Sequence, residues 1–216
     1  MARKLKRPRV LGNKSHNPKN HGPKTRGRKP ALPRRIGMTD NIRNIDGSMA
    51  LRGLRPDEAL IDRTYRPVGM TARPLAALAR ARHIRVLQAG APRAIRPPVG
   101  GCHLPEWALR RFGSMVKNLP AHLLVTAAAH GERAVIAAAR AGVDAVLISP
   151  VFATASHPGG KSLGVIRFAR LARQARSLGL GVYALGGTGS PASIRRLGGI
   201  PISGIAGIGF LGRPQA

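Results

Sequence analysis

The most constraining stretch of the sequence is a short apolar run that leads into a polar loop and then into a helical pattern. The run is Ala145–Ile148, and the loop carries the hydroxyl side chains of Thr154 and Ser156 next to a pair of glycines. Beyond Gly164 the apolar residues follow a helical period. A buried strand that delivers a polar loop at its carboxyl end and then enters a helix is the repeating unit of parallel α/β folds. The stretch therefore predicts an α/β protein with its functional groups at the carboxyl ends of the strands.

Two further strand ends near the C-terminus carry glycines. Val182–Leu185 is followed by Gly186 and Gly187, and Ser190-Pro191 then offers the residue types preferred at a helix start. Gly204–Leu211 is a third candidate. Hydroxyls and glycine backbone can present several donors to one phosphate at little steric cost. One Gly-Gly pair alone is more often a tight turn, whereas three successive junctions favour the phosphate site common at the end of a (β/α)8 barrel.

The rest of the chain alternates between short apolar runs and helical patterns. Five more strands are predicted, at Pro33–Asp40, Glu58–Arg63, His83–Gln88, Gly100–Leu104 and His122–Ala127. Helices are predicted at Ser48–Leu54, Pro74–Arg82, Glu106–Lys117, His130–Ala141 and Val165–Leu178, the last with Ile166 and Phe168 on its apolar side. The proline-broken segment Ala89–Pro98 indicates a lost or reduced helix. Eight strands in this alternation predict a compact TIM (β/α)8 barrel over residues 33–216.

The N-terminal segment is dominated by positive charge. The chain has 37 Lys and Arg against 8 Asp and Glu, a formal net charge of +29, and no acid occurs before Asp40. Residues 1–32 have almost nothing apolar to bury, so a basic disordered arm is predicted there. Nonspecific contact with nucleic acid is one function for such an arm. A solvated extension without a function, or translation that starts at Met38, are the alternatives.

Cysteine content and hydropathy indicate the cellular compartment of the protein. Cys102 is the only cysteine, which excludes an internal disulfide and is typical of a reducing compartment. No apolar run approaches the ~20 residues of a membrane span. We therefore expect a cytoplasmic protein without a membrane partner, and the sequence leaves its oligomeric state open.

The glycine-bearing strand ends also carry a resemblance to a known family. The order of SPVF, T-x-S, ALGGT and GIAGI in this chain resembles the thiamine phosphate synthase/TenI family. The resemblance spans roughly Pro33 to Leu211 and implies a TIM barrel. It also implies a divergent synthase of thiamine biosynthesis, a transferase that couples hydroxymethylpyrimidine diphosphate to thiazole phosphate with loss of pyrophosphate. In this family the reaction uses Mg²⁺.

The resemblance assigns a phosphate site to the last three strand ends. Thr154 and Ser156 match the two hydroxyls of the family's T-x-T-K loop, and His157 takes the place of its lysine. The backbone contacts to phosphate match the residues at the ends of the last two strands, which are Gly186, Gly187, Gly207 and Ile208. The thiazole phosphate half of the site is therefore expected to be retained.

The half of the site that binds metal and diphosphate departs from the family pattern. Arg63 matches the arginine of the family's Q-x-R-x-K motif, but Tyr65 replaces the lysine, with Arg66 one step further as a partial substitute. Gln88-Ala89-Gly90 replaces the acidic pair after the third strand, and Glu106 is the only carboxylate near the fourth. A hard cation needs several oxygen ligands, so Glu106 is a weak candidate for Mg²⁺.

His130 supports a different reaction. It follows the fifth strand, where the tautomerase branch of the family has an S-x-H triplet, and here the triplet is Ala128-Ala129-His130. Imidazole can act as both acid and base near neutral pH, so the alternative function is a TenI-type thiazole tautomerase, an isomerase that uses His130. A noncatalytic phosphate-binding relative is a third alternative. His103 lies within a predicted core strand and is more often a satisfied buried histidine than a ligand.

Overall fold

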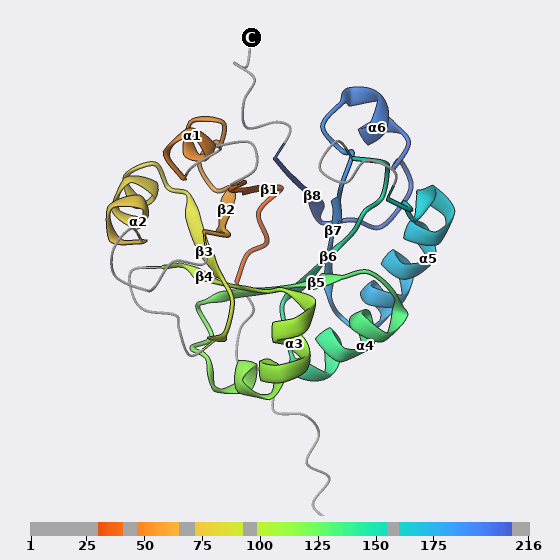
Figure 1. Cartoon of the computed structure of the whole chain (residues 1–216), viewed down its shortest axis with the longest axis horizontal. Helices are drawn as coiled ribbons and strands as arrows, with labels where there is room; N and C mark the ends of the chain where they lie inside the picture. The colour runs from red at the N-terminus through yellow and green to blue at the C-terminus, as the bar shows by residue number, and fades with distance from the viewer. Residues whose placement is uncertain (1–29, 41–46, 65–71, 93–98, 155–159, 209–216) are drawn as a thin grey trace, which may run out of the picture.

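The computed structural model describes residues 30–40, 47–64, 72–92, 99–154 and 160–208, and side chains from Leu75 onward in the third of these ranges. Eight parallel strands form a closed barrel, in which each strand pairs with the next along the chain and the last pairs with the first (Figure 1). The strands are β1 (Arg35–Met38), β2 (Ala59–Asp62), β3 (Arg85–Ala89), β4 (Gly101–Leu104), β5 (Leu124–Ala129), β6 (Ala145–Ile148), β7 (Gly181–Leu185) and β8 (Gly204–Gly207). The predicted (β/α)8 architecture is confirmed.

The helices lie around the strands (Figure 1). They are α1 (Gly47–Arg52), α2 (Ala72–Ala81), α3 (Glu106–Phe112), the 3₁₀ helix η2 (Gly113–Asn118), α4 (Glu132–Ala141), α5 (Gly164–Ser177) and α6 (Pro191–Arg195). The predicted cap of α6 is confirmed, because the Ser190 hydroxyl accepts a hydrogen bond from the Ser193 amide at 3.1 Å and Pro191 is the first helical residue.

Three details of the predicted helices are wrong. The single helix expected over residues 106–117 changes to 3₁₀ geometry at Gly113, and α4 begins at Glu132 rather than at His130. Ile166 is 86% exposed, because it shares a helix face with Arg170 and Arg173 rather than with the buried Phe168. The predicted N-terminal arm up to residue 29 and most of the proline-broken segment, residues 93–98, lie outside the described residues.

Small aliphatic side chains fill the barrel interior, as expected from an aromatic content of 3%. The strand register brings alternate residues inward, and the buried interior cluster consists of Ile36, Met38, Ala59, Ile61, Leu87, Ala89, Leu124, Ala145, Leu147, Tyr183 and Ala206. A second cluster lies between the wall and helices α3 to α6, and a third lies under α1 and α2. Burial on both faces of the sheet explains why the strands are continuously apolar.

Tyr183 is the one aromatic side chain of the interior cluster. It is fully buried, and its hydroxyl donates a hydrogen bond of 2.7 Å to the Pro33 carbonyl just before β1. Burial raises the pKa of the Tyr183 phenol, so the group stays a protonated donor. The bond joins β7 to the start of β1 across the amino end of the barrel.

The Tyr183→Phe variant tests this link. The substitution keeps the ring but leaves the buried Pro33 carbonyl without its donor, so we expect the free energy of unfolding to fall by about 1–3 kcal/mol. Urea denaturation should show a lower midpoint with an unchanged slope. A midpoint equal to that of the wild type would contradict the structural role of the hydroxyl.

Candidate active site at the barrel mouth

The carboxyl ends of the strands gather most of the predicted site residues at one mouth. Arg63 follows β2, His130 follows β5, Gly186 and Gly187 follow β7, and Gly207 ends β8. Because all eight strands run parallel, these positions lie at the same end of the barrel. Of the predicted residues, Arg66, Ser156 and His157 lie outside the described residues.

A close approach between the loop after β6 and the end of β7 forms a glycine cradle, defined here as Thr154, Gly186 and Gly187. The Val151 amide donates to the Leu185 carbonyl at 2.9 Å, and the Phe152 amide donates to the Gly186 carbonyl at 3.1 Å. The two segments predicted to converge are therefore in contact.

The cradle requires glycine at position 187. Its φ of 68° lies in the left-handed region, and a Cβ there would sit 2.6 Å from Phe152 Cβ and 2.8 Å from the Ala153 carbonyl oxygen. A Cβ at Gly186 would also come within 3.2 Å of Thr154 Cγ2. Because Gly186 and Gly187 have no side chains, their backbone packs directly against the loop that carries Thr154.

The last strand adjoins this cradle. The buried Thr188 hydroxyl donates to the Ala206 carbonyl at 3.1 Å, which ties the segment after β7 to β8. Gly207 and Ile208 follow Ala206, so the predicted backbone contacts of β8 lie beside those of β7. The three glycine-bearing strand ends are thus adjacent, as the sequence predicted.

Two residues near the mouth escaped the sequence analysis. Arg196, just after α6, lies with its guanidinium 4.8 Å from the centroid of the Phe152 ring, beside the cradle. Ser149 follows β6 and contacts His130. Arg196 had no sequence signal, and Ser149 belongs to the SPVF motif, but its contact with His130 was not predicted, because the two residues are distant along the chain.

His130 is held through one ring nitrogen. Its Nδ1 lies 2.9 Å from the Ser149 carbonyl oxygen and 3.3 Å from the Ser149 hydroxyl. A carbonyl can only accept, so Nδ1 carries the proton and Nε2 is the unprotonated nitrogen of the neutral ring. His130 is exposed at the end of β5, so Nε2 is available to a ligand as a proton acceptor.

Arg63 is anchored at the ends of β1 and β2. Its Nε and one terminal nitrogen donate to the Thr39 carbonyl at 2.9 and 2.7 Å, and its amide donates to the Thr39 hydroxyl at 2.7 Å. Its positive charge is also near His103 and is the second cause, after burial, of that residue's lowered pKa. The guanidinium is therefore a fixed positive charge on the β1–β2 side of the mouth.

His103 is a buried core histidine, as predicted. Its Nδ1 lies 2.9 Å from the Thr126 hydroxyl oxygen. Burial and, to a lesser extent, the nearby positive charge of Arg63 together lower the pKa of His103 to about 3. The imidazole is neutral in the folded protein at physiological pH.

The carboxylates of the described residues do not form a three-ligand metal cluster. Among the described residues no three His, Cys, Asp or Glu side chains come together. Two carboxylates are engaged at the amino ends of the strands. Glu58 forms a salt bridge of 2.6 Å with Arg35, and Asp144 accepts a hydrogen bond of 2.7 Å from the Val125 amide. Asp62 accepts from the Thr64 amide, and Glu106 is the half-buried first residue of α3. A Mg²⁺ ion at this mouth would therefore depend on waters and substrate phosphates for most of its coordination.

The fold and its mouth define a (β/α)8 barrel whose glycine-bearing loops converge after β6, β7 and β8. The TMP-TENI family model, described as thiamine monophosphate synthase, matches residues 60–211, and the chain belongs to this family. A curated relative, the putative thiamine-phosphate synthase 2 of Aquifex aeolicus, is 32% identical over 94 residues, which cover 44% of this chain and 48% of the relative. The chain thus matches about half of that relative's length.

Solved structures agree on the fold. Thiamine phosphate pyrophosphorylase from Pyrococcus furiosus superposes with a TM-score of 0.61 at 18% identity, over 83% of this chain and 88% of that one. Deoxyribose phosphate aldolase from Aeropyrum pernix superposes with a TM-score of 0.57 at 17% identity, and the match covers 82% of this chain and 86% of the aldolase. Identities this low show the shared barrel and nothing finer. No helix in the described part of the chain has the length and apolar character needed to cross a membrane.

The lowered pKa of His103 predicts a pH-dependent stability. The unfolded imidazole has a pKa near 6.5, so between about pH 3 and 6.5 the unfolded state binds more protons, and the free energy of unfolding falls as the pH is lowered. From pH 7 to pH 5 we expect His103 to account for a loss of about 1–2 kcal/mol. Urea denaturation of His103→Gln should show a correspondingly smaller loss over this interval. Equal losses in both proteins would contradict the prediction.

Proposed function

We propose that this protein binds a thiazole phosphate at the barrel mouth and that His130 moves a proton on the thiazole ring. The observation that carries the proposal is the fixed orientation of His130, whose Nδ1 is 2.9 Å from the Ser149 carbonyl oxygen. The reaction is the tautomerase reaction known in this family, and thiamine biosynthesis is its setting.

The phosphate is assigned to the cradle and the adjoining β8. Thr154, Gly186 and Gly187 supply a hydroxyl and exposed backbone, and Gly207 and Ile208 continue the same surface. The absence of a side chain at Gly187 lets the loop after β6 pack directly against the end of β7, since a Cβ there would lie 2.6 Å from Phe152, and this packing brings Thr154 to the exposed glycine backbone. Ser156 and His157 belong to the same proposed site by family resemblance, whereas Arg66 is the partial substitute for the lysine of the half that binds diphosphate.

The proton transfer needs no external oxidant or metal. Nε2 of His130 removes a proton from one ring carbon, and the electrons of that C–H bond shift into the ring. The imidazolium then returns a proton to another ring atom, so charge and atoms balance. Ser149 orients the imidazole, since its carbonyl accepts a hydrogen bond from Nδ1 and keeps that nitrogen protonated in the neutral ring.

Coupling of thiazole phosphate to an aminopyrimidine diphosphate is the second candidate. It is supported by the family model and by Arg63, whose fixed charge suits a leaving pyrophosphate. Mg²⁺ would supply charge neutralisation in that reaction, but the described residues offer it no cluster of three ligands. A noncatalytic phosphate-binding relative is the third candidate.

Calorimetric titration separates these candidates. The purified protein is titrated with thiazole phosphate, and then with aminopyrimidine diphosphate plus Mg²⁺. Binding of thiazole phosphate alone is expected. Binding of both ligands would favour the synthase reaction, and binding of neither would overturn the proposed ligand.

The His130→Ala variant tests the catalytic group. We expect it to bind thiazole phosphate like the wild type but to lose about 10²- to 10⁴-fold in the rate of ring-proton exchange, measured by NMR in deuterated water. His122→Ala is the matched control, because His122 is exposed and lies before the opposite end of β5. Equal exchange rates in the two variants would remove His130 from the mechanism.

The Gly187→Ala variant tests the cradle. The new methyl collides with Phe152 and the Ala153 carbonyl, so we expect thiazole phosphate affinity to fall at least tenfold in calorimetry. Gly199→Ala is the control, because Gly199 has a similar φ of 75° but nothing within 4 Å of the added Cβ. In both variants the left-handed backbone conformation of the new alanine lowers the free energy of unfolding by about 1–2 kcal/mol. Unchanged affinity in Gly187→Ala would place the phosphate elsewhere.

A further inference from the structure

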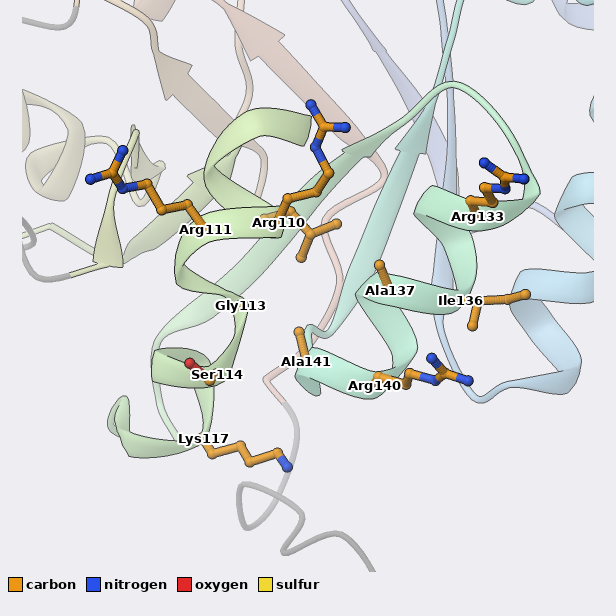
Figure 2. A pocket seen from close by; sticks show the side chains of 11 residues that line it. Arg110, Arg111, Gly113, Ser114, Lys117, Arg133, Ile136, Ala137, Arg140 and Ala141 are labelled. Carbon is orange, nitrogen blue, oxygen red and sulfur yellow. The ribbon is translucent and has the colours of Figure 1, made fainter.

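A groove of about 670 Å³ lies on the outer helical layer, between α3–η2 and α4. Figure 2 shows the two helical segments side by side, with long basic side chains extending from both. The groove belongs to the helices that cover the barrel wall, so it is separate from the mouth at the strand ends. The function proposed for the mouth makes no use of it.

The groove is lined by five cations and by no acid. Arg110, Arg111 and Lys117 come from α3–η2, and Arg133 and Arg140 come from α4. All five are exposed. The acids of these helices, Glu106 and Glu132, are at the first residue of α3 and of α4, and Glu132 accepts a hydrogen bond from Gln174 on α5. The field inside the groove is therefore strongly positive.

The cations are spaced along the groove rather than clustered at one point. Arg133 and Arg140 are seven residues apart on α4, about 10 Å at 1.5 Å per residue, and therefore share one face of the helix. Arg110 and Lys117 have the same separation in sequence on the opposite wall. One phosphate group cannot reach both ends of such rows, whereas a chain of phosphates can.

An aromatic pair on α3 lies next to Arg111, with Phe112 packed against the core and Trp107 exposed. The guanidinium of Arg111 is 5.6 Å from the centroid of the Phe112 ring, and that ring meets Trp107 edge-to-face at 6.4 Å. Trp107 is 52% exposed, although large aromatic side chains of this protein are otherwise scarce. Trp107 precedes Arg110 and Arg111 by one helical turn on α3, and an exposed indole so close to the groove can stack with an unpaired base.

We propose that the groove between α3–η2 and α4 binds a single-stranded nucleic acid, with phosphates along the cation rows and a base on Trp107. Charge complementarity selects the ligand, since five cations without an acid attract a polyanion and repel a second copy of this basic chain. The single strand is favoured over a duplex because only unpaired bases expose a face to the indole.

The experiment compares two triple variants of the full chain with the same loss of charge. The groove variant is Arg110→Gln, Lys117→Gln and Arg140→Gln. The control variant is Arg52→Gln, Arg80→Gln and Arg195→Gln, three exposed arginines on α1, α2 and α6 that do not line the groove. Affinity for a labelled single-stranded oligouridylate is measured by fluorescence anisotropy over a range of salt concentrations.

The groove variant should bind at least tenfold more weakly than the control variant, which should stay close to the wild type. Its salt dependence should also be less steep by about 2 in the log–log slope, because each lost phosphate contact on a single strand contributes about 0.7. Equal weakening of both triple variants would overturn the proposal, since it would reflect attraction to the whole basic surface.

The tryptophan supplies an independent signal. Trp107 is the only tryptophan of the chain, so its fluorescence should be quenched as the oligonucleotide binds, and Trp107→Ala should weaken binding about tenfold. Unquenched fluorescence would overturn the stacking contact. If the protein bound vesicles of anionic lipid more tightly than the oligonucleotide and the groove variant lost this binding, the groove would be assigned to a membrane surface instead. If the protein self-associated and the groove variant did not, the groove would be assigned to a second copy.

Discussion

Closure of the barrel is the constraint on which the rest of the structure depends. The pairing of β8 with β1 places Ala206 beside Ile36 and completes a ring in which every strand has two neighbours. Because the ring is parallel throughout, the loops after β6, β7 and β8 meet at one end, and the cradle of Thr154, Gly186 and Gly187 forms there. Tyr183 supports the closure from the other end through its bond to Pro33.

The scarcity of acids shapes both the mouth and the outer surface. The chain has only eight Asp and Glu residues against 37 Lys and Arg, and two of the eight, Glu58 and Asp144, are engaged at the amino ends of their strands. The described part of the mouth accordingly has no cluster of ligands for a hard cation. The same shortage leaves a groove that Arg110 and Arg140 help to line without any acid in its lining, and the resulting positive field favours an anionic partner.

The sequence predicted the fold better than the site. All eight strands were found, because each is a short apolar run bounded by polar or glycine residues, and a barrel buries both faces of every strand. The change to 3₁₀ geometry at Gly113 and the exposure of Ile166 were missed, since packing against neighbouring helices decides them. In the site, the position of His130 was predicted, but its partner Ser149 on the next strand was not.

The sequence by itself determined the alternation of strands and helices, the apolar interior, the glycines at three strand ends and the large positive charge. These follow from local composition and periodicity, which neighbouring residues alone define. Only the tertiary structure decided which groups meet: Ser149 with His130, Arg196 with Phe152, and the cations of α3–η2 with those of α4. Such pairs depend on strand register and on helix packing, so residues far apart in the chain become neighbours through the geometry of the closed barrel.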